Sequence, residues 1–358
     1  MNEEFNSPGI TLRDIARSLG ISHVSVSLAL RNAPQISLAR RQQIQEKARE
    51  MGYRPNPMAA ALGQLRFAGK ARAVTAELAW ISYQEDSQDI RRFKEFDLYW
   101  SGASQSAKWF GYNLEEFICN TNFSLARVEK ILRARGVHGI LIPPHSKLPP
   151  NWDSFHWEHF SVVRFGHSIL RPRVHVVTSD QITNSLLAFA KIQSKGYKRI
   201  GYVSSLTSST RHKAGVLMAQ SNLAPKHQVP PLIFVTGNNN PEDQRKLCLW
   251  LKKTKPDAIL TDVAAMREML QSAKYHVPND IGLAVFSVLD GNADAGIYQN
   301  PEEIGKAAME MLISLINHNH TGIPKICREL LIEGEWVDGT TLPPRPSLIA
   351  SKSPSPSL

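Results

Sequence analysis

Residues 11–32 read TLRDIARSLGISHVSVSLALRN and carry the signals of two short helices joined by a tight turn. Thr11 and Asp14 have the spacing of a capping box, in which the hydroxyl accepts from the Asp14 amide and the carboxylate accepts from the Thr11 amide. The first helix should stop at Gly20, and Ser22 is placed to cap the second. A connection this short predicts a helix-turn-helix corner.

A third helix is predicted over residues 38–51, with Ser37 as its cap and Gly52 after its end. Apolar residues at helical spacing then complete a three-helix core. The predicted core residues are Ile15, Leu19, Val26, Leu30, Ile36, Ile44, Ala48 and Met51. Residues 10–55 are therefore predicted to form an all-α domain.

The second helix carries the residues suited to DNA contact. In a helix-turn-helix the start of this helix reaches base edges in the major groove. His23 can donate or accept a hydrogen bond there, and Val24 can press on a thymine methyl. The hydroxyls of Ser25 and Ser27 suit phosphate contacts, and Asn32 follows on the outward side. For any one of these residues, a plain solvated side chain is an equally good interpretation.

Residues 53–63, YRPNPMAAALG, follow this domain. Asn56 can cap a helix, Pro57 suits its first position, and the alanines favour helix. A helix of about two turns is marginal in water, so it should need support from DNA and a symmetry mate. The alternative is an Ala-rich linker.

The positive charge of the chain is concentrated near its N-terminus. The net charge is +10, and residues 10–72 hold eleven Lys or Arg against three acids. A basic module attached to a nearly neutral body is expected of a protein that binds the phosphate backbone. A solvated surface helix would also explain the charge alone.

Residues 10–63 resemble the DNA-binding headpiece and hinge of the lactose-repressor/galactose-repressor family, through TLRDIARSLGISHVSVSLALRN (11–32) and AREMGYRPNPMAAAL (48–62) in one register. The resemblance implies that His23 and Val24 set specificity and that Leu62 enters the minor groove as a wedge that kinks the DNA. Many members have a guanine-reading arginine at the position of Leu28, so the half-site is expected to differ from the common one. The candidate DNA-binding residues are Thr11, Ser22, His23, Val24, Ser25, Ser27, Asn32, Tyr53, Asn56, Ala59 and Leu62.

From about residue 73 the chain alternates short apolar runs with helical stretches, which predicts parallel sheets in two lobes with a ligand cleft between them. The predicted domains are the helix-turn-helix (10–55), a hinge helix and linker (56–72), a two-lobed effector-binding and dimerisation domain (73–340) and a disordered tail (341–358). The tail prediction rests on its Pro- and Ser-rich composition.

The body also resembles this family and the periplasmic-binding-protein fold, through GYKRIGYV (196–203), RHKAGV (211–216) and KPDAILTD (255–262). The resemblance implies that Arg211 and Asp262 bind the effector, although a surface salt bridge and a helix N-cap are the alternatives for them. Tyr83, at the end of the first strand, could stack on a ligand, but an aromatic residue there more often belongs to the core.

One departure from the family concerns the effector. Members usually carry Gly-Phe-Asp-Asp after the strand that ends near Val285, whereas this chain has Val285-Phe286-Ser287-Val288. Both carboxylates are missing, so the family resemblance does not predict a standard sugar effector.

Several function classes lack their sequence signals. The three cysteines are far apart and predict reduced thiols, and the twelve histidines show no zinc-binding spacing. Nucleotide-binding loops, hydrolase motifs and apolar runs of roughly 18 residues are absent from the sequence. We therefore expect no enzyme activity, no metal, no cofactor and no membrane association, and a cytoplasmic location.

The sequence thus predicts an all-α helix-turn-helix headpiece followed by a two-lobed, periplasmic-binding-protein-like α/β sensor domain with parallel sheets. The predicted function is transcriptional regulation, with repression as the favoured direction. The predicted partners are a pseudo-palindromic double-stranded DNA operator, a small-molecule effector of which a carbohydrate is one candidate, and a second copy in a homodimer. The alternative is a sugar-binding protein without operator-specific DNA binding.

Overall fold

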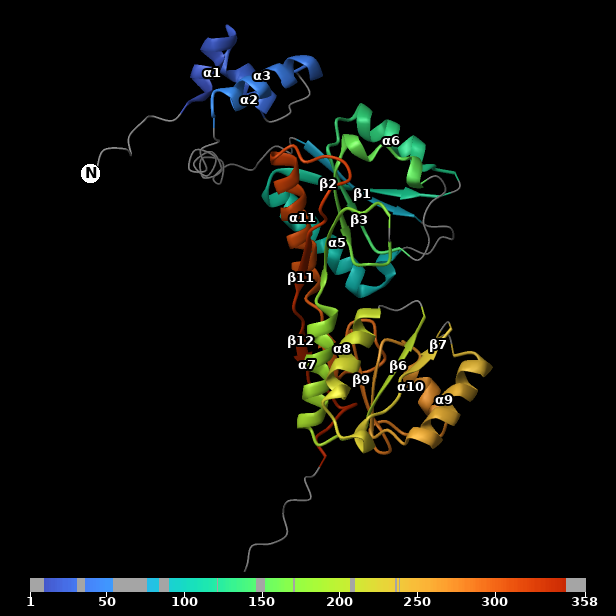
Figure 1. Cartoon of the computed structure of the whole chain (residues 1–358). Helices are drawn as coiled ribbons and strands as arrows, with labels where there is room; N and C mark the ends of the chain where they lie inside the picture. Colours follow the sequence, from blue (N-terminus) through green and yellow to red (C-terminus); the bar gives the residue numbers. More distant parts are fainter. Residues whose placement is uncertain are drawn as a thin grey trace, which may run out of the picture.

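The computed structural model describes residues 10–30, 36–53, 76–83, 90–120, 122–145, 152–169, 171–206, 210–235, 237 and 239–345. They form a small helical domain, called the headpiece, and a larger α/β body of two lobes (Figure 1). This architecture confirms the predicted fold class. Among the described helices, none combines the length and the apolar character that a membrane crossing requires.

The headpiece packs three helices around a small apolar core. They are α1 (Leu12–Leu19), α2 (His23–Leu30) and α3 (Leu38–Glu50). The buried residues are Ile15, Ala16, Val26, Ala29, Ile44 and Ala48, with Leu12, Leu19, Ile21, Leu30, Ile36, Met51 and Tyr53 packed around them. Every residue predicted for this core belongs to it.

The ends of the headpiece helices follow the predicted signals with one exception. The Thr11 amide donates to Asp14 Oδ2 at 2.9 Å and the Asp14 amide to Thr11 Oγ1 at 3.4 Å, which completes the capping box. Gly20 ends α1 with φ 63°, a conformation that favours glycine. Ser22 caps α2, because its hydroxyl accepts from an amide in the first turn of that helix. Ser37 occupies the N-cap position of α3 as predicted, but its side chain makes no capping hydrogen bond.

The first lobe is built on a six-stranded parallel sheet in the order β11-β5-β4-β3-β1-β2. Its strands are β1 (Ala76–Tyr83), β2 (Tyr112–Cys119), β3 (Gly139–Ile142), β4 (Ser161–Phe165), β5 (His175–Ser179) and β11 (Glu329–Ile332). One face is covered by α5 (Lys94–Trp109), which follows the short η1 (Ile90–Arg92), and by α11 (Pro301–Asn317). The other is covered by α6 (Leu125–Ala134), η2 (Trp152–Ser154) and η3 (Trp157–His159).

The second lobe repeats this plan in the order β12-β10-β9-β8-β6-β7, with β12 antiparallel to β10. Its strands are β6 (Ile200–Ser205), β7 (Leu232–Phe234), β8 (Ala258–Thr261), β9 (Gly282–Val285), β10 (Gly296–Tyr298) and β12 (Glu335–Val337). α7 (Gln181–Ser194) and α8 (Thr210–Ser221) cover one face, and α9 (Pro241–Thr254) and α10 (Met266–Ser272) the other. The short η4 (Pro225–His227) follows α8.

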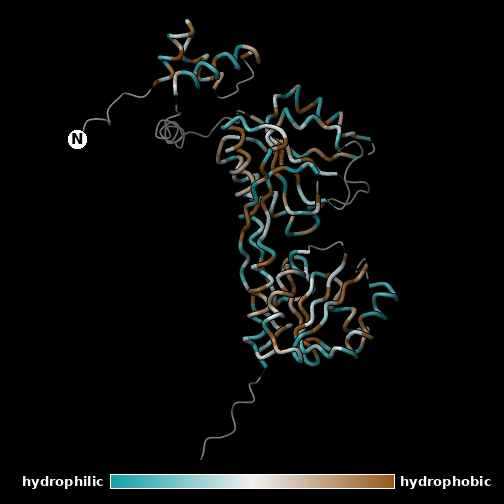
Figure 2. The backbone as a smooth tube through the Cα atoms, viewed as in Figure 1, coloured by the Kyte–Doolittle hydropathy of each residue, from teal (hydrophilic) through white to brown (hydrophobic). Residues whose placement is uncertain are grey.

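The chain passes between the lobes from β5 to α7, from β10 to α11 and from β11 to β12. Figure 1 shows these segments along one side of the two lobes. The tube in Figure 2 is brown along many strands and largely teal along α6 and α9, as expected for sheets buried between amphipathic helices.

The structure corrects the prediction of a disordered tail from residue 341. Leu342 is fully buried in the core of the second lobe that α7 and α8 cover. The amides of Thr340 and Thr341 each donate to the Asp294 carboxylate at 2.8 Å. The buried leucine and the hydrogen bonds to the distant Asp294 hold this segment, although no apolar period signals it. Residues 346–358 lie outside the described residues.

Helices α5 and α11 pack so closely that each needs a glycine at the contact. A Cβ on Gly102 of α5 would overlap the carbonyl oxygen of Glu302, and a Cβ on Gly305 of α11 would overlap the carbonyl oxygen of Tyr99. Both obstacles are backbone atoms, which cannot rotate away. The close approach therefore depends on glycine at these two positions.

We expect Gly305→Ala to lower the free energy of unfolding of the body by about 1–3 kcal/mol, the usual effect of overpacking. In an unconstrained helix the same change would stabilise by about 0.5–1 kcal/mol. The sign of the change in unfolding free energy therefore shows whether the helices are in close contact at Gly305. Ser314→Ala, on the exposed side of α11, is the control. Denaturant unfolding checks this, and a Gly305→Ala protein as stable as the parent would contradict the packing described.

Candidate nucleic-acid interface and ligand site

The first turn of α2 presents two side chains to solvent. His23 and Val24 are exposed, Val24 by 52%, whereas Val26 behind them is fully buried. The turn is held by Ser22, whose hydroxyl accepts from the Ser25 amide at 3.0 Å and lies 2.9 Å from the Ser25 hydroxyl. An imidazole and an exposed apolar side chain are thus displayed on a fixed helical turn.

Other predicted DNA-binding residues have structural tasks within the headpiece. The Thr11 hydroxyl donates to Asp14 at 2.6 Å, and these Thr11 hydrogen bonds lower the pKa of that carboxyl. Ser27 is half-buried on α2. Tyr53 packs against the headpiece core, where burial raises the pKa of its phenol. The remaining candidates, Asn32, Asn56, Ala59 and Leu62, lie outside the described residues.

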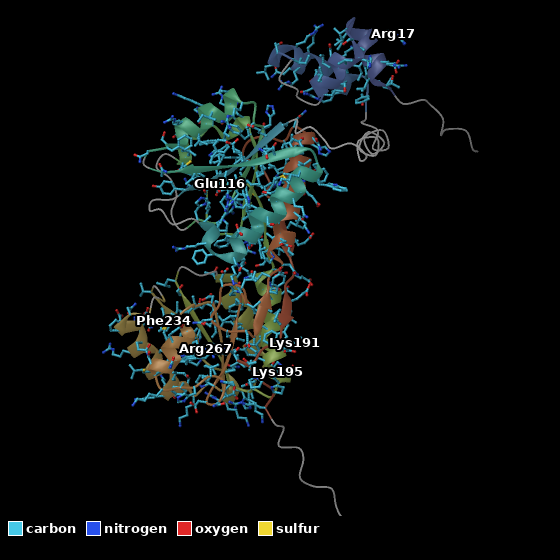
Figure 3. The ribbon with its side chains drawn as sticks, turned by 180° about the vertical axis from the view of Figure 1, so that it is seen from behind. Arg17, Glu116, Lys191, Lys195, Phe234 and Arg267 are labelled. Atoms are coloured by element: carbon cyan, nitrogen blue, oxygen red, sulfur yellow. The ribbon has the colours of Figure 1, made fainter. Side chains whose placement is uncertain are left out.

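The acids of the headpiece are neutralised locally. Asp14 pairs with Arg17 at 3.5 Å, Glu50 with Lys47 at 3.0 Å and Glu46 with Arg49 at 2.7 Å, each within one helix. The net positive charge of this domain therefore comes from cations beyond those pairs. Figure 3 labels Arg17 on the headpiece, and its side chain is 82% exposed.

Tyr83 lies at the end of β1, half-buried against the first-lobe core that α6 covers. Its amide donates to Nε2 of His145 at 2.8 Å. Burial lowers the pKa of His145 to about 4, so the ring is neutral and can accept this hydrogen bond. Tyr83 therefore packs with core residues, which is the second of the two interpretations that the sequence offered for it.

Asp262 follows β8 directly and accepts a hydrogen bond from the hydroxyl of Ser204 at 2.8 Å. It does not cap α10, because the residue at that N-cap position is Ala265. The helix-cap alternative for Asp262 is therefore wrong.

The buried His212 ring lies on Phe286 with ring centroids 4.0 Å apart, and burial lowers the pKa of His212 to about 3.

Arg211 stands in the first turn of α8 and reaches the first lobe. Its Nη2 lies 3.2 Å from Oε2 and 3.4 Å from Oε1 of Glu329 on β11. The salt-bridge alternative is thus present, and it joins the two lobes. Sequence reasoning missed Glu329, and it also missed Arg164 within β4 and His167 just after that strand. A charged residue inside the apolar run VVRF (162–165) was the available signal.

A second polar contact joins the lobes where the expected carboxylates are missing. Asp290 of the second lobe accepts from the amides of Lys94 and Glu95 at 2.9 and 3.0 Å, at the start of α5. The Glu95 side chain is buried, accepts from Tyr99 at 3.3 Å and lies 3.5 Å from Gln299 Nε2. Burial raises the pKa of Glu95 to about 7, and the nearby Asp290 charge adds to this rise.

Within the described residues, no group of three or more His, Cys, Asp or Glu side chains has the arrangement of a metal site. The three cysteines are free thiols. Burial raises the pKa of Cys119 to about 12, so this thiol is protonated.

Two family models match the chain in separate regions. Residues 11–56 match the bacterial regulatory proteins of the lacI family, and residues 189–341 match a periplasmic binding protein-like domain. The first match covers the headpiece, and the second covers most of the second lobe.

Similar proteins match almost the whole chain. The HTH-type transcriptional regulator MalR of Staphylococcus xylosus is 22% identical over 91% of this chain and 97% of its own length. The regulator RegA of Clostridium saccharobutylicum is 22% identical over 91% of this chain and 98% of its own length.

Two solved structures share the fold. The complex of the transcriptional regulator CelR with cellobiose has a TM-score of 0.57 at 17% identity, covering 93% of this chain and 99% of that one. The lac repressor dimer bound to operator and an anti-inducer has a TM-score of 0.53 at 15% identity, covering 94% and 100%.

The raised pKa of Glu95 predicts a pH dependence of stability. The folded state binds this proton more tightly than the unfolded chain, whose ordinary value is 4.5. The resulting stabilisation is fully present below 4.5 and is lost as pH rises through about 7. Glu95→Gln, which resembles the protonated acid, should therefore raise the melting temperature relative to the parent at about pH 8 more than at about pH 5.

Thermal unfolding of both proteins at the two pH values checks this prediction. The control is Glu115→Gln, since Glu115 is only partly buried on β2 and is paired with Arg135 at 2.7 Å. An equal difference between parent and Glu95→Gln at both pH values would show that Glu95 is ionised in the folded state.

Proposed function

The chain belongs to the lacI family of bacterial regulatory proteins, and from this premise we propose that it regulates transcription by binding a pseudo-palindromic DNA site as a homodimer. A small molecule held between the lobes changes that binding. Such a protein acts in the cytoplasm and needs no catalytic activity. The exposed first turn of α2 is the observation that carries the proposal.

In this proposal α2 enters the major groove. His23 and Val24 contact base edges, and the hydroxyls of Ser25 and Ser27 face the phosphates. Val24 is 52% exposed on this capped turn, so its side chain is accessible to a partner. A thymine methyl is a suitable partner, and the surrounding cations supply the attraction to phosphates.

The remaining DNA roles rest on the family resemblance. Thr11, Ser22, Asn32 and Tyr53 position the headpiece on the backbone. Asn56, Ala59 and Leu62 belong to a hinge helix that folds in the minor groove beside its symmetry mate, with Leu62 as the wedge. The domain limits at 10–55 and 56–72 follow from the same scheme, and the body that begins at about residue 73 includes Leu342.

Regulation requires the lobes to respond to a ligand. Asp262 directly follows β8 of the second lobe, and Arg211, in the first turn of α8, already crosses to the first lobe. The structure neighbours include a regulator bound to cellobiose, which makes a carbohydrate one candidate effector. A ligand that favours one arrangement of the lobes would change DNA affinity by about 1–3 kcal/mol.

Selection from random duplexes with the full chain tests the proposal. The expected product is a two-fold-related sequence with half-sites about one helical turn apart. Binding that is the same for every duplex would instead favour a small-molecule-binding protein without site-specific DNA recognition.

We expect His23→Ala and Val24→Ala each to weaken binding to the selected duplex by about 1–3 kcal/mol and to leave binding to a scrambled duplex unchanged. The reason is that base contacts discriminate sequence whereas phosphate contacts do not. Fluorescence anisotropy with both duplexes measures this. Leu249→Ala, an exposed apolar residue on α9 with 61% exposure, is the matched control. Equal losses on both duplexes would argue against base reading by α2.

A further inference from the structure

A row of side chains crosses the edge of the first-lobe sheet. Arg164 on β4 pairs in register with Val176 on β5, and Val176 pairs with Glu329 on β11. Residues in register on neighbouring strands project from the same face, and strands lie about 4.8 Å apart. Arg164 and Glu329 therefore start from the same face of the sheet, with backbones roughly 10 Å apart.

Arg164 is a buried cation without a carboxylate partner in the described structure. Only 8% of its surface is exposed, its Nη1 donates to the carbonyl oxygen of Ile169, and its buried Nε has no hydrogen-bond partner. Burial lowers the pKa of this guanidinium. A buried arginine is normally paired, because an isolated charge is costly to remove from water.

Two further side chains, those of Arg211 and His167, approach Arg164 and can offer an anion a positive charge or a hydrogen-bond donor. Arg211 arrives from the second lobe in the first turn of α8, where the helix dipole also favours an anion. His167 follows β4, and its buried Nε2 has no hydrogen-bond partner in the described structure. Burial and then the Arg211 charge lower the pKa of His167, so these groups are close enough to interact.

Glu329 is the carboxylate paired with this cluster among the ion pairs of the described residues. Glu329 pairs with Arg211 at 3.2 Å, and both side chains are partly exposed, by 40% and 34%. A pair of this kind contributes little to stability, so a ligand can replace the carboxylate at small cost. A planar oxyanion would match the fork of either guanidinium better than a neutral hydroxyl would.

We propose that Arg164 and Arg211, with His167, bind an oxyanion of the effector, a carboxylate or a phosphate, which takes the place of Glu329 at Arg211. This inference rests on the proposed function and narrows it, since the effector is then an acidic small molecule and not a neutral sugar. The anion joins a residue of β4 to a residue of α8, and it therefore draws the two lobes together.

Isothermal titration of the full chain without DNA tests this proposal with inorganic phosphate and succinate as probes and glucose as the neutral comparison. We expect one of the two anions to bind, and which one does so separates a phosphate from a carboxylate effector. Arg211→Met should weaken that binding at least about tenfold, the effect of losing a charge-assisted hydrogen bond. Glu329→Gln should tighten it, because the competing carboxylate is gone.

Matched variants separate this site from general attraction to a basic protein. Glu115→Gln removes an equivalent, partly exposed carboxylate from the pair with Arg135 and should leave anion affinity unchanged. Arg164→Met is expected to weaken anion binding as Arg211→Met does. If the substitution at buried Arg164 prevents folding, the variants at the partly exposed Arg211 and Glu329 still test the proposal. Anion affinity that is the same in the parent, Arg211→Met and Glu329→Gln would overturn the proposal.

Selection of DNA duplexes distinguishes failure of the oxyanion site from failure of the proposed regulatory function. If neither anion binds while the chain still selects a two-fold-related duplex and glucose binds, the oxyanion site is wrong and the regulator proposal stands. If the chain selects no duplex but the anion binds as described, the ligand site stands without its regulatory role.

Discussion

The packing of Ile15, Val26 and Ile44 in the headpiece is the constraint on which the proposed function depends. These side chains are fully buried, and together they fix the rotation of α2 against α1 and α3. With Val26 held inward, Val24, two positions earlier, faces the opposite side of α2, and His23 is exposed at the start of the helix. Sequence-specific contact needs side chains held in place before DNA arrives, and a three-helix core with capped ends supplies this.

The body applies a related constraint at the boundary between its lobes. Asp290 caps the start of α5 across that boundary, and Arg211 reaches Glu329 at another point. These contacts are polar and partly exposed, so they can be exchanged for contacts with a ligand at modest cost. By contrast, α5 and α11 are locked together through Gly102 and Gly305. Because the contacts between the lobes can be replaced by contacts with a ligand while each lobe stays intact, ligand binding can change how the lobes are arranged.

Much of the fold could be predicted because local signals and long-range packing agree. Thr11, Gly20 and Ser22 act through hydrogen bonds and backbone preferences that are visible within a few residues. The short strands β10, β11 and β12 were not predicted, since they lie at or next to the sheet edges and their pairing depends on distant parts of the chain. The packing of Leu342 was also missed, because it depends on a distant part of the chain.

The candidate sites divide in the same way. His23 and Val24 could be chosen from the helix-turn-helix pattern, whereas Arg164, His167 and Glu329 come together through strand register and lobe arrangement, which spacing in the sequence does not show. Tyr83 was a candidate because of its position at a strand end, but its neighbours are core residues of the first lobe. Function at the headpiece is local in sequence, and function between the lobes is not.

Hydroxyl-radical footprinting of the full chain on a selected duplex tests the central claim most directly. The account predicts two protected half-sites related by a two-fold axis, with their centres about one helical turn apart and protection that disappears on a scrambled duplex. A single protected patch, or protection of the same extent on any sequence, would contradict it.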